Sequence, residues 1–267
     1  MVRPVIIASL SMALAAAGSA LPAAPRDYCP DRPGIGNPTC TMEAGATSVE
    51  VGLADWSRDS MGGSERTTDL LLGDLLVRRG IADHAEVQIG WTSFGRHVER
   101  GPLGTTSQNG VGDVFLVVRR NLKSPDGSGT SLAVMIHGAL PTGGVAAGSG
   151  DWSAGLEVPL SFQLNDHLSF ALMPSVEAAV DEDRSGRHLA YANVVGLTDK
   201  LSDRLNATVE YQLERDRDPS GHQTFHVAGL SIGLQPNDDL QFDFGVNAGL
   251  NHAATDVELY AGISRRF

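Results

Sequence analysis

Two short acidic motifs are the residues of this 267-residue chain whose types and spacing come nearest to a known binding chemistry. Asp-x-Asp-x-Ser-Gly occurs at residues 181–186 and again at 216–221, and alternating carboxylates of this kind open a calcium-binding loop. Position twelve of the two loops would be Ala192 and Val227, so each lacks the bidentate glutamate that completes such a loop. We therefore expect solvated acidic turns and no metal centre, and leave weak calcium binding by these loops open.

Histidines could support catalysis if a serine and a carboxylate lay beside them. Of the eight histidines, His137, His188 and His226 fall within segments that alternate like strands, and none is part of a His-x-Ser-Asn motif of the type that barrel lipases carry. We expect His137 on the same face as Met135, as a hydrogen-bonded structural residue. The Gly-rich stretch 141–150 lacks the Gly-Lys-Ser/Thr of a phosphate loop. The sequence predicts no enzyme, no catalytic residue and no cofactor.

The elements that must position these groups are β-strands, because apolar and polar residues alternate with period two along most of the chain. In 205–214 and 240–251, every second residue is apolar and its neighbours are polar or glycine. Twelve such strands are predicted: 47–57, 66–78, 85–92, 111–122, 130–140, 154–164, 168–180, 188–199, 205–214, 223–234, 240–251 and 257–267. Those around Leu72 and Val194 could face either way.

Strands with one apolar and one polar face lie between two different solvents. Their number is even, as single-chain bacterial outer-membrane barrels require. We therefore predict an all-β fold, a closed antiparallel transmembrane β-barrel of about twelve strands with lipid outside and a polar lumen inside. The lengths of the segments between the predicted strands indicate short turns at the periplasmic end and longer loops at the extracellular end. A soluble periplasmic β-sandwich has the same periodicity and is the alternative fold.

The final strand, from Val257 to Phe267, alternates to its last residue and stops on an aromatic. It resembles the closing strand of bacterial outer-membrane barrels, the segment that the barrel-assembly machinery recognises. On this resemblance Tyr260, Ile263 and Phe267 form the expected assembly signal. The predicted location is the outer membrane of a Gram-negative bacterium, where lipid and lipopolysaccharide surround the barrel.

The polar faces of the predicted strands are rich in carboxylates. Those expected to line the lumen and set its selectivity are Asp113, Glu157, Glu177, Glu210, Asp243 and Glu258. Because an acidic tube attracts cations and repels anions, a cation preference is predicted. The alternative is that arginines such as Arg78, or loops folded inward, neutralise these groups. The net charge of −12 argues against nucleic acid as a partner.

The N-terminus predicts export. A basic start, an apolar run over residues 5–17 and the small residues after it are typical of a signal peptide, with cleavage after Ala20 or as late as Ala24. The predicted organisation is a signal peptide at 1–20, an N-terminal periplasmic leader at 21–46 and the barrel at 47–267.

The leader contains the only two cysteines of the chain, Cys29 and Cys40. We expect a disulfide between them, because the exported compartment is oxidising and the enclosed loop is short. Two free thiols are the alternative.

Several segments taken together resemble one family. They are Cys29–Gly34, Pro38–Thr41, Gly112–Val114, Pro141–Gly143, Asn247–His252, Asp256–Glu258 and Gly262–Phe267. This set is similar to the proteobacterial outer-membrane "transporter" proteins of the MetA-pathway phenol-degradation family, over roughly Cys29 to Phe267. The resemblance implies a barrel with a role in aromatic uptake and no catalytic residues.

The predicted function is a porin-like channel for passive uptake of small solutes, including aromatic or other small organic compounds. A barrel enzyme acting on lipid and a non-conducting surface barrel are the alternatives. The oligomeric state stays open.

Overall fold

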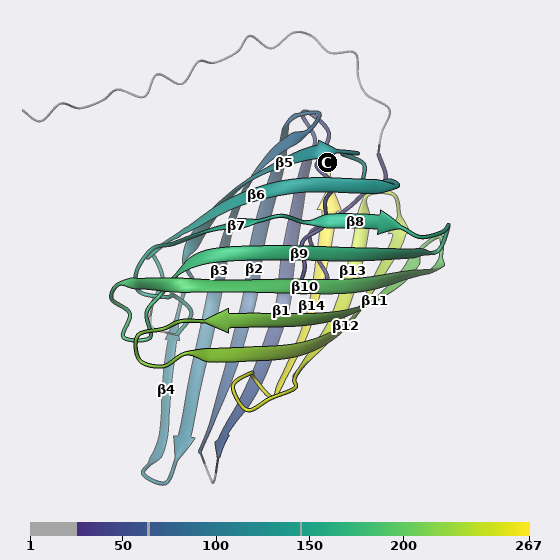
Figure 1. The fold of residues 1–267 in the computed structure, drawn as a ribbon. Coiled ribbons are helices and arrows are strands. Elements are labelled where there is room, and N and C mark those ends of the chain that lie inside the picture. Colours follow the sequence, from purple (N-terminus) through teal and green to yellow (C-terminus); the bar gives the residue numbers. More distant parts are fainter. Residues whose placement is uncertain (1–25, 63–64, 145) are drawn as a thin grey trace, which may run out of the picture.

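The computed structural model describes residues 26–62, 65–144 and 146–267, and within them the chain folds into one large antiparallel sheet (Figure 1). Its strands are β1 (Thr47–Gly62), β2 (Glu65–Ala82), β3 (Ala85–Gly101), β4 (Gly104–Gly110), β5 (Val114–Lys123), β6 (Thr130–Leu140), β7 (Ser153–Glu157), β8 (Leu160–Gln163), β9 (Leu168–Val180), β10 (Arg187–Ser202), β11 (Leu205–Asp216), β12 (Gln223–Asn237), β13 (Leu240–Gly249) and β14 (Val257–Arg266). No helix in these ranges is both long and apolar enough to span a membrane.

The sheet closes on itself, because β14 pairs with β1 and every other strand except β4, which pairs with β3 alone, has a neighbour on each side. β4 and β5 both pair with β3, and β7 and β8 both lie between β6 and β9, so the fourteen labelled strands occupy twelve positions around the barrel. The predicted closed barrel of about twelve strands is confirmed. Closure leaves no sheet edge, so every strand can satisfy its backbone groups within the wall.

The two ends of the barrel differ as predicted. Two-residue turns at 83–84, 203–204 and 238–239 lie at the end that holds Phe267, the periplasmic end. The longer connections 141–152, 181–186, 217–222 and 250–256 lie at the opposite, extracellular end. β1, β2, β3 and β4 extend beyond the rest of the barrel there (Figure 1).

The structure corrects two strand boundaries. Residues 96–110, expected as a loop, continue β3 and form β4, pairing from Gly95↔Gly110 to Gly101↔Gly104. The sequence of β4 has no apolar alternation, and as an extension of the wall beyond the other strands it needs no lipid-facing side. The predicted single strand 154–164 is interrupted between β7 and β8, where Pro159 has no backbone N–H to donate to the sheet.

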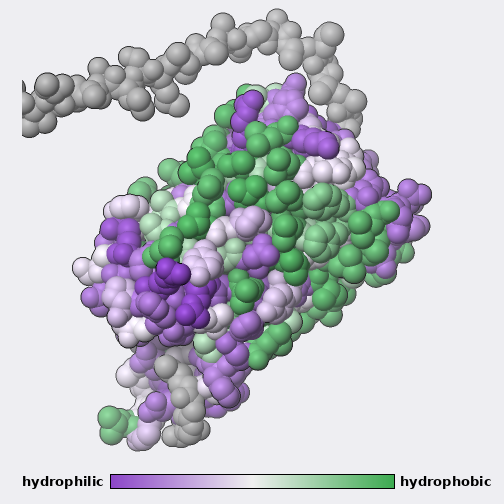
Figure 2. Space-filling model, viewed as in Figure 1, coloured by the Kyte–Doolittle hydropathy of each residue, from purple (hydrophilic) through white to green (hydrophobic). Residues whose placement is uncertain are grey.

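Apolar side chains cover the outside of the barrel. On neighbouring strands Leu116, Val118 and Ile136 are 48%, 52% and 60% exposed, and Figure 2 shows a broad hydrophobic surface over the strands with hydrophilic residues gathered towards the ends. Among the largest fully buried side chains are Arg78, Arg119, Glu50 and Glu86. This inside-out distribution is the reverse of a soluble protein and is typical of a barrel wall in lipid.

The leader carries the predicted disulfide. Cys29 and Cys40 are joined, with their Cα atoms 6.5 Å apart. The segment passes within the outline of the barrel (Figure 1) rather than along its outside. The signal-peptide prediction falls on residues outside the described ranges.

The lipid-facing surface gives a stability prediction. Replacing Ile136, in the middle of β6, by Arg should destabilise the folded barrel by ~2–4 kcal/mol, because a charge would face the hydrocarbon core. Leu103→Arg is the matched control, since Leu103 is 104% exposed at the β3–β4 turn and should change stability by less than ~0.5 kcal/mol. Equilibrium unfolding in denaturant, with the barrel in lipid vesicles, measures both. Equal effects of the two variants would contradict a membrane-facing β6.

Candidate functional site: a polar lumen crossed by the leader

The leader, residues 26–46, contacts the inner wall on many sides of the barrel. Asp31 N donates to Glu50 of β1 at 3.0–3.1 Å, and Met42 N donates to Glu86 of β3 at 2.7 Å. Further contacts reach β11, β13, β7 and β8. Since the leader has no strand of its own until Thr47, wall side chains supply the acceptors that a strand neighbour would otherwise provide.

Three of the predicted lumen carboxylates bind this leader. Glu210 accepts from Ile35 N at 2.7 Å and from Gly36 N at 2.9 Å. Asp243 pairs with Arg32 at 3.1 Å. Glu157 accepts from Asn37 Nδ2 at 2.7 Å.

Glycine allows the close approach at Glu210. Gly34 has a φ of +125°, a backbone conformation that residues with a side chain rarely adopt. A Cβ at this position would lie 2.8 Å from Glu210 Oε2. A larger residue here would push the leader away from β11.

The other three predicted carboxylates contact the wall or a loop. Glu177 lies 4.0 Å from His137, whose Nδ1 is 3.3 Å from Glu157. Glu258 accepts from Asn247 Nδ2 at 2.7 Å. Asp113 accepts from Gly143 N at 2.7 Å and also from Ser149, and so holds the 141–150 loop against the barrel. The six residues thus contact different parts of the protein and are not joined in one ring.

A buried ion-pair network lies at the centre of the leader's contacts. Arg78 is 3.0 Å from Asp31, Glu50 and Glu86, and Arg119 is 2.7 Å from Asp31 and 3.1 Å from Glu86. The two arginines, Glu50 and Glu86 are 0% exposed, and Asp31 is 7% exposed. Removing one partner from such a network leaves another charge buried without compensation, which typically costs ~3–5 kcal/mol.

The strand register explains why these charges meet. Glu86 on β3 is directly opposite Arg119 on β5, and Arg78 on β2, the other neighbour of β3, is opposite Gln88, two residues along from Glu86. The inward side chains of β2, β3 and β5 therefore converge. The arginines also bind both cysteines of the leader, Arg78 through the carbonyl of Cys29 at 2.8 Å and Arg119 through that of Cys40 at 3.2 Å.

Sequence reasoning did not foresee this role of the two arginines. It named Arg78 only as a partner that could neutralise lumen acids. Asp31 and Arg32, the leader residues that pair with the wall, were not singled out. The feature of the sequence that could have indicated them is the charge of the leader, because a segment inside a polar lumen needs charged or polar side chains to contact the wall.

Among the described residues, two cavities lie in the lumen. One of about 710 Å³ reaches the periplasmic turns and is lined there by His167, Lys200 and Arg204. The other, of about 530 Å³, reaches the extracellular loop 250–256. Both are lined by Asp31 and Pro33, so the leader lies between them.

The outer cavity combines acidic and apolar groups. Its carboxylates are Asp55, Glu214 and Glu258, on strands β1, β11 and β14. Phe225 and Tyr260 supply aromatic surface, and Ile35 and Val227 aliphatic surface. Such a lining can contact the apolar body of a small organic molecule while a carboxylate faces its polar group.

The family follows from comparison of the whole sequence. Residues 30–267 match the family model described as "Putative MetA-pathway of phenol degradation". The chain belongs to this family. The match covers the described barrel and the leader from residue 30 onward, so that part of the leader belongs to the family pattern. No curated protein matches the chain.

Several solved structures have a fold similar to that of this chain. The COG4313 outer membrane channel from Pseudomonas putida F1 has a TM-score of 0.71 at 16% identity, covering 88% of this chain and 99% of that chain. The NanC porin has a TM-score of 0.53 at 11% identity, with coverages of 81% and 98%. The β domain of the Bordetella autotransporter BrkA has a TM-score of 0.51 at 14% identity, with coverages of 84% and 100%. At these identities the likeness shows a shared fold, that of outer-membrane channels and related barrels.

The ion-pair network gives a prediction about the leader. Asp31→Asn should loosen the leader, because Arg78 and Arg119 each lose a buried carboxylate partner, at a cost of ~3–5 kcal/mol. Hydrogen exchange of the Ile35 and Gly36 amides should become faster. The control is Asp203→Asn, which removes an ion pair with Lys200 whose Asp side chain is 99% exposed and should leave these amides unchanged. Unaltered exchange in Asp31→Asn would show that the leader is held by other contacts.

Proposed function

We propose that this chain is an outer-membrane channel of a Gram-negative bacterium for the passive uptake of small solutes, including aromatic or other small organic compounds. The observation that carries the proposal is a polar lumen, inside an apolar wall, that contains a cavity on each side of the leader. Membership of the phenol-degradation family and a fold shared with outer-membrane channels support it.

Passage would follow the polar wall from the outer cavity to the inner one. Barrels of eight strands have packed interiors and those of sixteen or more enclose wide pores, so twelve strands leave room for a narrow path. The leader narrows this path further, because it is bound to β1, β3, β7, β8, β11 and β13. The rate of passage should therefore depend on how tightly the leader is held.

The proposal contains no catalytic step. A barrel enzyme acting on lipid and a non-conducting surface barrel remain as the rival functions, and the fold shared with the β domain of an autotransporter makes the second a real competitor. Reconstitution into planar bilayers with a panel of small aromatic and aliphatic solutes separates the three. Conductance or solute flux supports the channel. Lipid hydrolysis without flux favours the enzyme, and the absence of both favours the surface barrel.

Selectivity for cations is a further part of the proposal. Four carboxylates, those of Asp31, Asp55, Glu214 and Glu258, line the outer cavity with one arginine, Arg32. Asp31 is paired with Arg78 and Arg119, and Arg32 is paired with Asp243, so Asp55, Glu214 and Glu258 supply the net charge there. Glu210 and Glu157 are bound to the leader. A cluster of carboxylates in a low-dielectric tube concentrates cations, and the effect weakens as salt shortens the screening length to ~10 Å at 0.1 M.

Reversal potentials in a potassium chloride gradient test this selectivity. The parent protein should prefer potassium, and Glu214→Gln and Glu258→Gln should each reduce the preference because each removes a charge from the outer cavity. Glu99→Gln, on the β3 extension with a side chain 60% exposed, is the control and should leave the reversal potential unchanged. A parent protein that prefers chloride would end the selectivity proposal.

Assembly into the membrane is proposed to depend on the closing strand. Phe267 is 69% exposed at the end of the chain, whereas Tyr260 is 8% exposed and lies 5.6 Å beneath the Arg32 guanidinium, so it also contacts the leader. Ile263 lies between them in the sequence, opposite Val51 of β1.

Deleting Phe267 should lower the amount of folded barrel in the outer membrane. This amount is measured by heat-modifiable gel mobility. The direct energetic contribution of one interfacial residue is only ~0–1 kcal/mol, so a severalfold loss would reflect recognition during assembly. Phe242→Leu is the control, because it keeps an apolar lipid-facing residue (Phe242 is 44% exposed) away from the terminus. Normal assembly of the truncated chain would remove Phe267 from the signal.

A further inference from the structure

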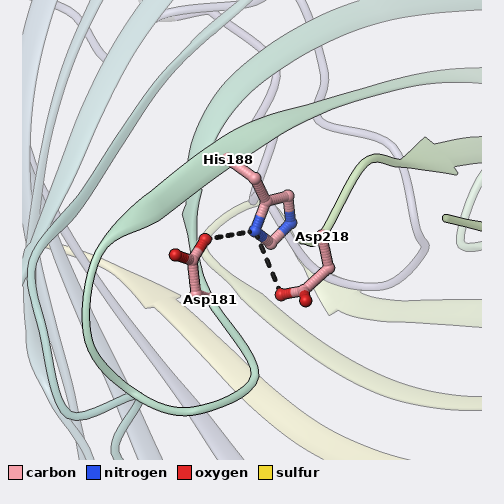
Figure 3. A group of neighbouring side chains, drawn as sticks. All are labelled: Asp181, His188 and Asp218. Carbon is pink, nitrogen blue, oxygen red and sulfur yellow. Dashed lines mark hydrogen bonds and ion pairs between the residues drawn. The ribbon is translucent and has the colours of Figure 1, made fainter. Parts of the chain in front are cut away.

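Two extracellular loops meet at one histidine. The loop 181–186 joins β9 to β10, the loop 217–222 joins β11 to β12, and His188 lies at the start of β10 between them (Figure 3). His188 Nδ1 is 2.9 Å from Asp181 Oδ1 and 3.3 Å from Asp218 Oδ2. The ligand-type atoms of these three residues all lie within 4.8 Å of one another.

The histidine is buried, although it belongs to the loop region. Its side chain is only 6% exposed and points into the carboxylate group. The second ring nitrogen, Nε2, is 3.0 Å from Asp216 Oδ1, but it is buried and makes no hydrogen bond, because its direction towards that oxygen is poor.

Three carboxylates, those of Asp181, Asp216 and Asp218, surround one imidazole, so the group carries an excess of negative charge. A divalent cation bound to Nδ1 between Asp181 and Asp218 would offset this excess.

The distances suit such a cation. Two ligand atoms that are each ~2.1 Å from a tetrahedral metal ion lie ~3.4 Å apart, close to the observed separations of Nδ1 from the two carboxylate oxygens. Asp218 is held in place by Ser220 N and Glu182 N, each donating at 2.7 Å. Gly186 has no side chain to clash with Asp181, whose Oδ2 would be 2.6 Å from a Cβ there.

We infer that Asp181, His188 and Asp218 form a site for one divalent first-row transition metal ion, of which Zn²⁺ is the representative. A nitrogen and two carboxylate oxygens suit zinc and its neighbours, whereas calcium and magnesium prefer oxygen ligands alone. Asp216 Oδ1, 3.0 Å from Nε2, would accept the proton of Nε2 once a small rotation of either side chain aligned the two, and would then orient the ring, as carboxylates commonly do for metal-bound histidines. The bound ion would join the loops after β9 and β11 at the extracellular end of the barrel.

The site differs from the calcium loop that the two Asp-x-Asp-x-Ser-Gly motifs suggested. Each motif contributes one ligand, Asp181 from the first and Asp218 from the second, and the third ligand lies outside both. The first motif supplies its ligand from position one and the second from position three. The calcium-loop spacing therefore does not describe the ligand set.

Isothermal titration of the mature, tag-free barrel in detergent with Zn²⁺ tests the inference. The parent protein should bind one Zn²⁺ per barrel at a saturable site that calcium does not occupy. His188→Gln and Asp218→Asn should each weaken this binding by more than tenfold. Asp216→Asn should weaken it by about tenfold, as loss of a residue that orients a ligand does. The matched control is His222→Gln, an exposed histidine in the same loop region, which should bind as the parent does.

Heat-modifiable gel mobility confirms that each variant is folded before titration. The inference is overturned if the parent protein has no saturable zinc site, or if His188→Gln and Asp218→Asn both retain the parent affinity. It is also overturned if His222→Gln loses the site as fully as His188→Gln, because the binding would then belong to the loop histidine and not to the buried one.

Discussion

The buried ion pairs between the leader and the wall are the interaction on which the rest of the interior depends. Arg78 and Arg119 lie between Asp31 of the leader and Glu50 and Glu86 of the strands, all shielded from solvent. Charges removed from water this completely must be paired and hydrogen-bonded, and neither the wall nor the leader alone supplies the full set. The buried charges of the wall are therefore fully paired only when the leader is bound, and those of the leader only inside the barrel.

This dependence shapes the path through the barrel. With Asp31 held by two arginines, the following residues continue across the lumen to Asp243 and Glu210, and the free space is divided into an outer and an inner cavity. A solute would meet an acidic and partly aromatic chamber before the leader and, after it, a rim of mixed charge where Asp166 and Asp203 lie with Lys200 and Arg204. The barrel wall is a continuous hydrogen-bonded sheet, whereas the leader is bound mainly by side chains, so a change in the path would come from the leader.

The carboxylates of the interior consequently have two different roles. Glu210, Asp243 and Glu157 satisfy backbone or side-chain donors of the leader, so they are part of how the interior is built. Asp55, Glu214 and Glu258 border the outer cavity, where a solute would meet them. At the outer loops a third set surrounds His188. Carboxylates of the same protein thus differ in role according to the groups that they contact.

The sequence by itself determined the wall. Period-two alternation from Leu205 to Glu214 and from Leu240 to Gly249 needs only neighbouring residues, because each strand must present one face to lipid and one to the lumen. The strand count, the turns and the Cys29–Cys40 pair followed from equally local patterns, although Pro159 interrupts a strand that its alternation alone predicted to be continuous. Only the tertiary structure decided that the leader crosses the lumen, that Val194 faces inward against Gly36, and that Arg78 meets Glu86 and Asp31. Those contacts join the leader to side chains on several strands of a closed sheet, and their positions depend on register and closure, which no local pattern in the sequence encodes.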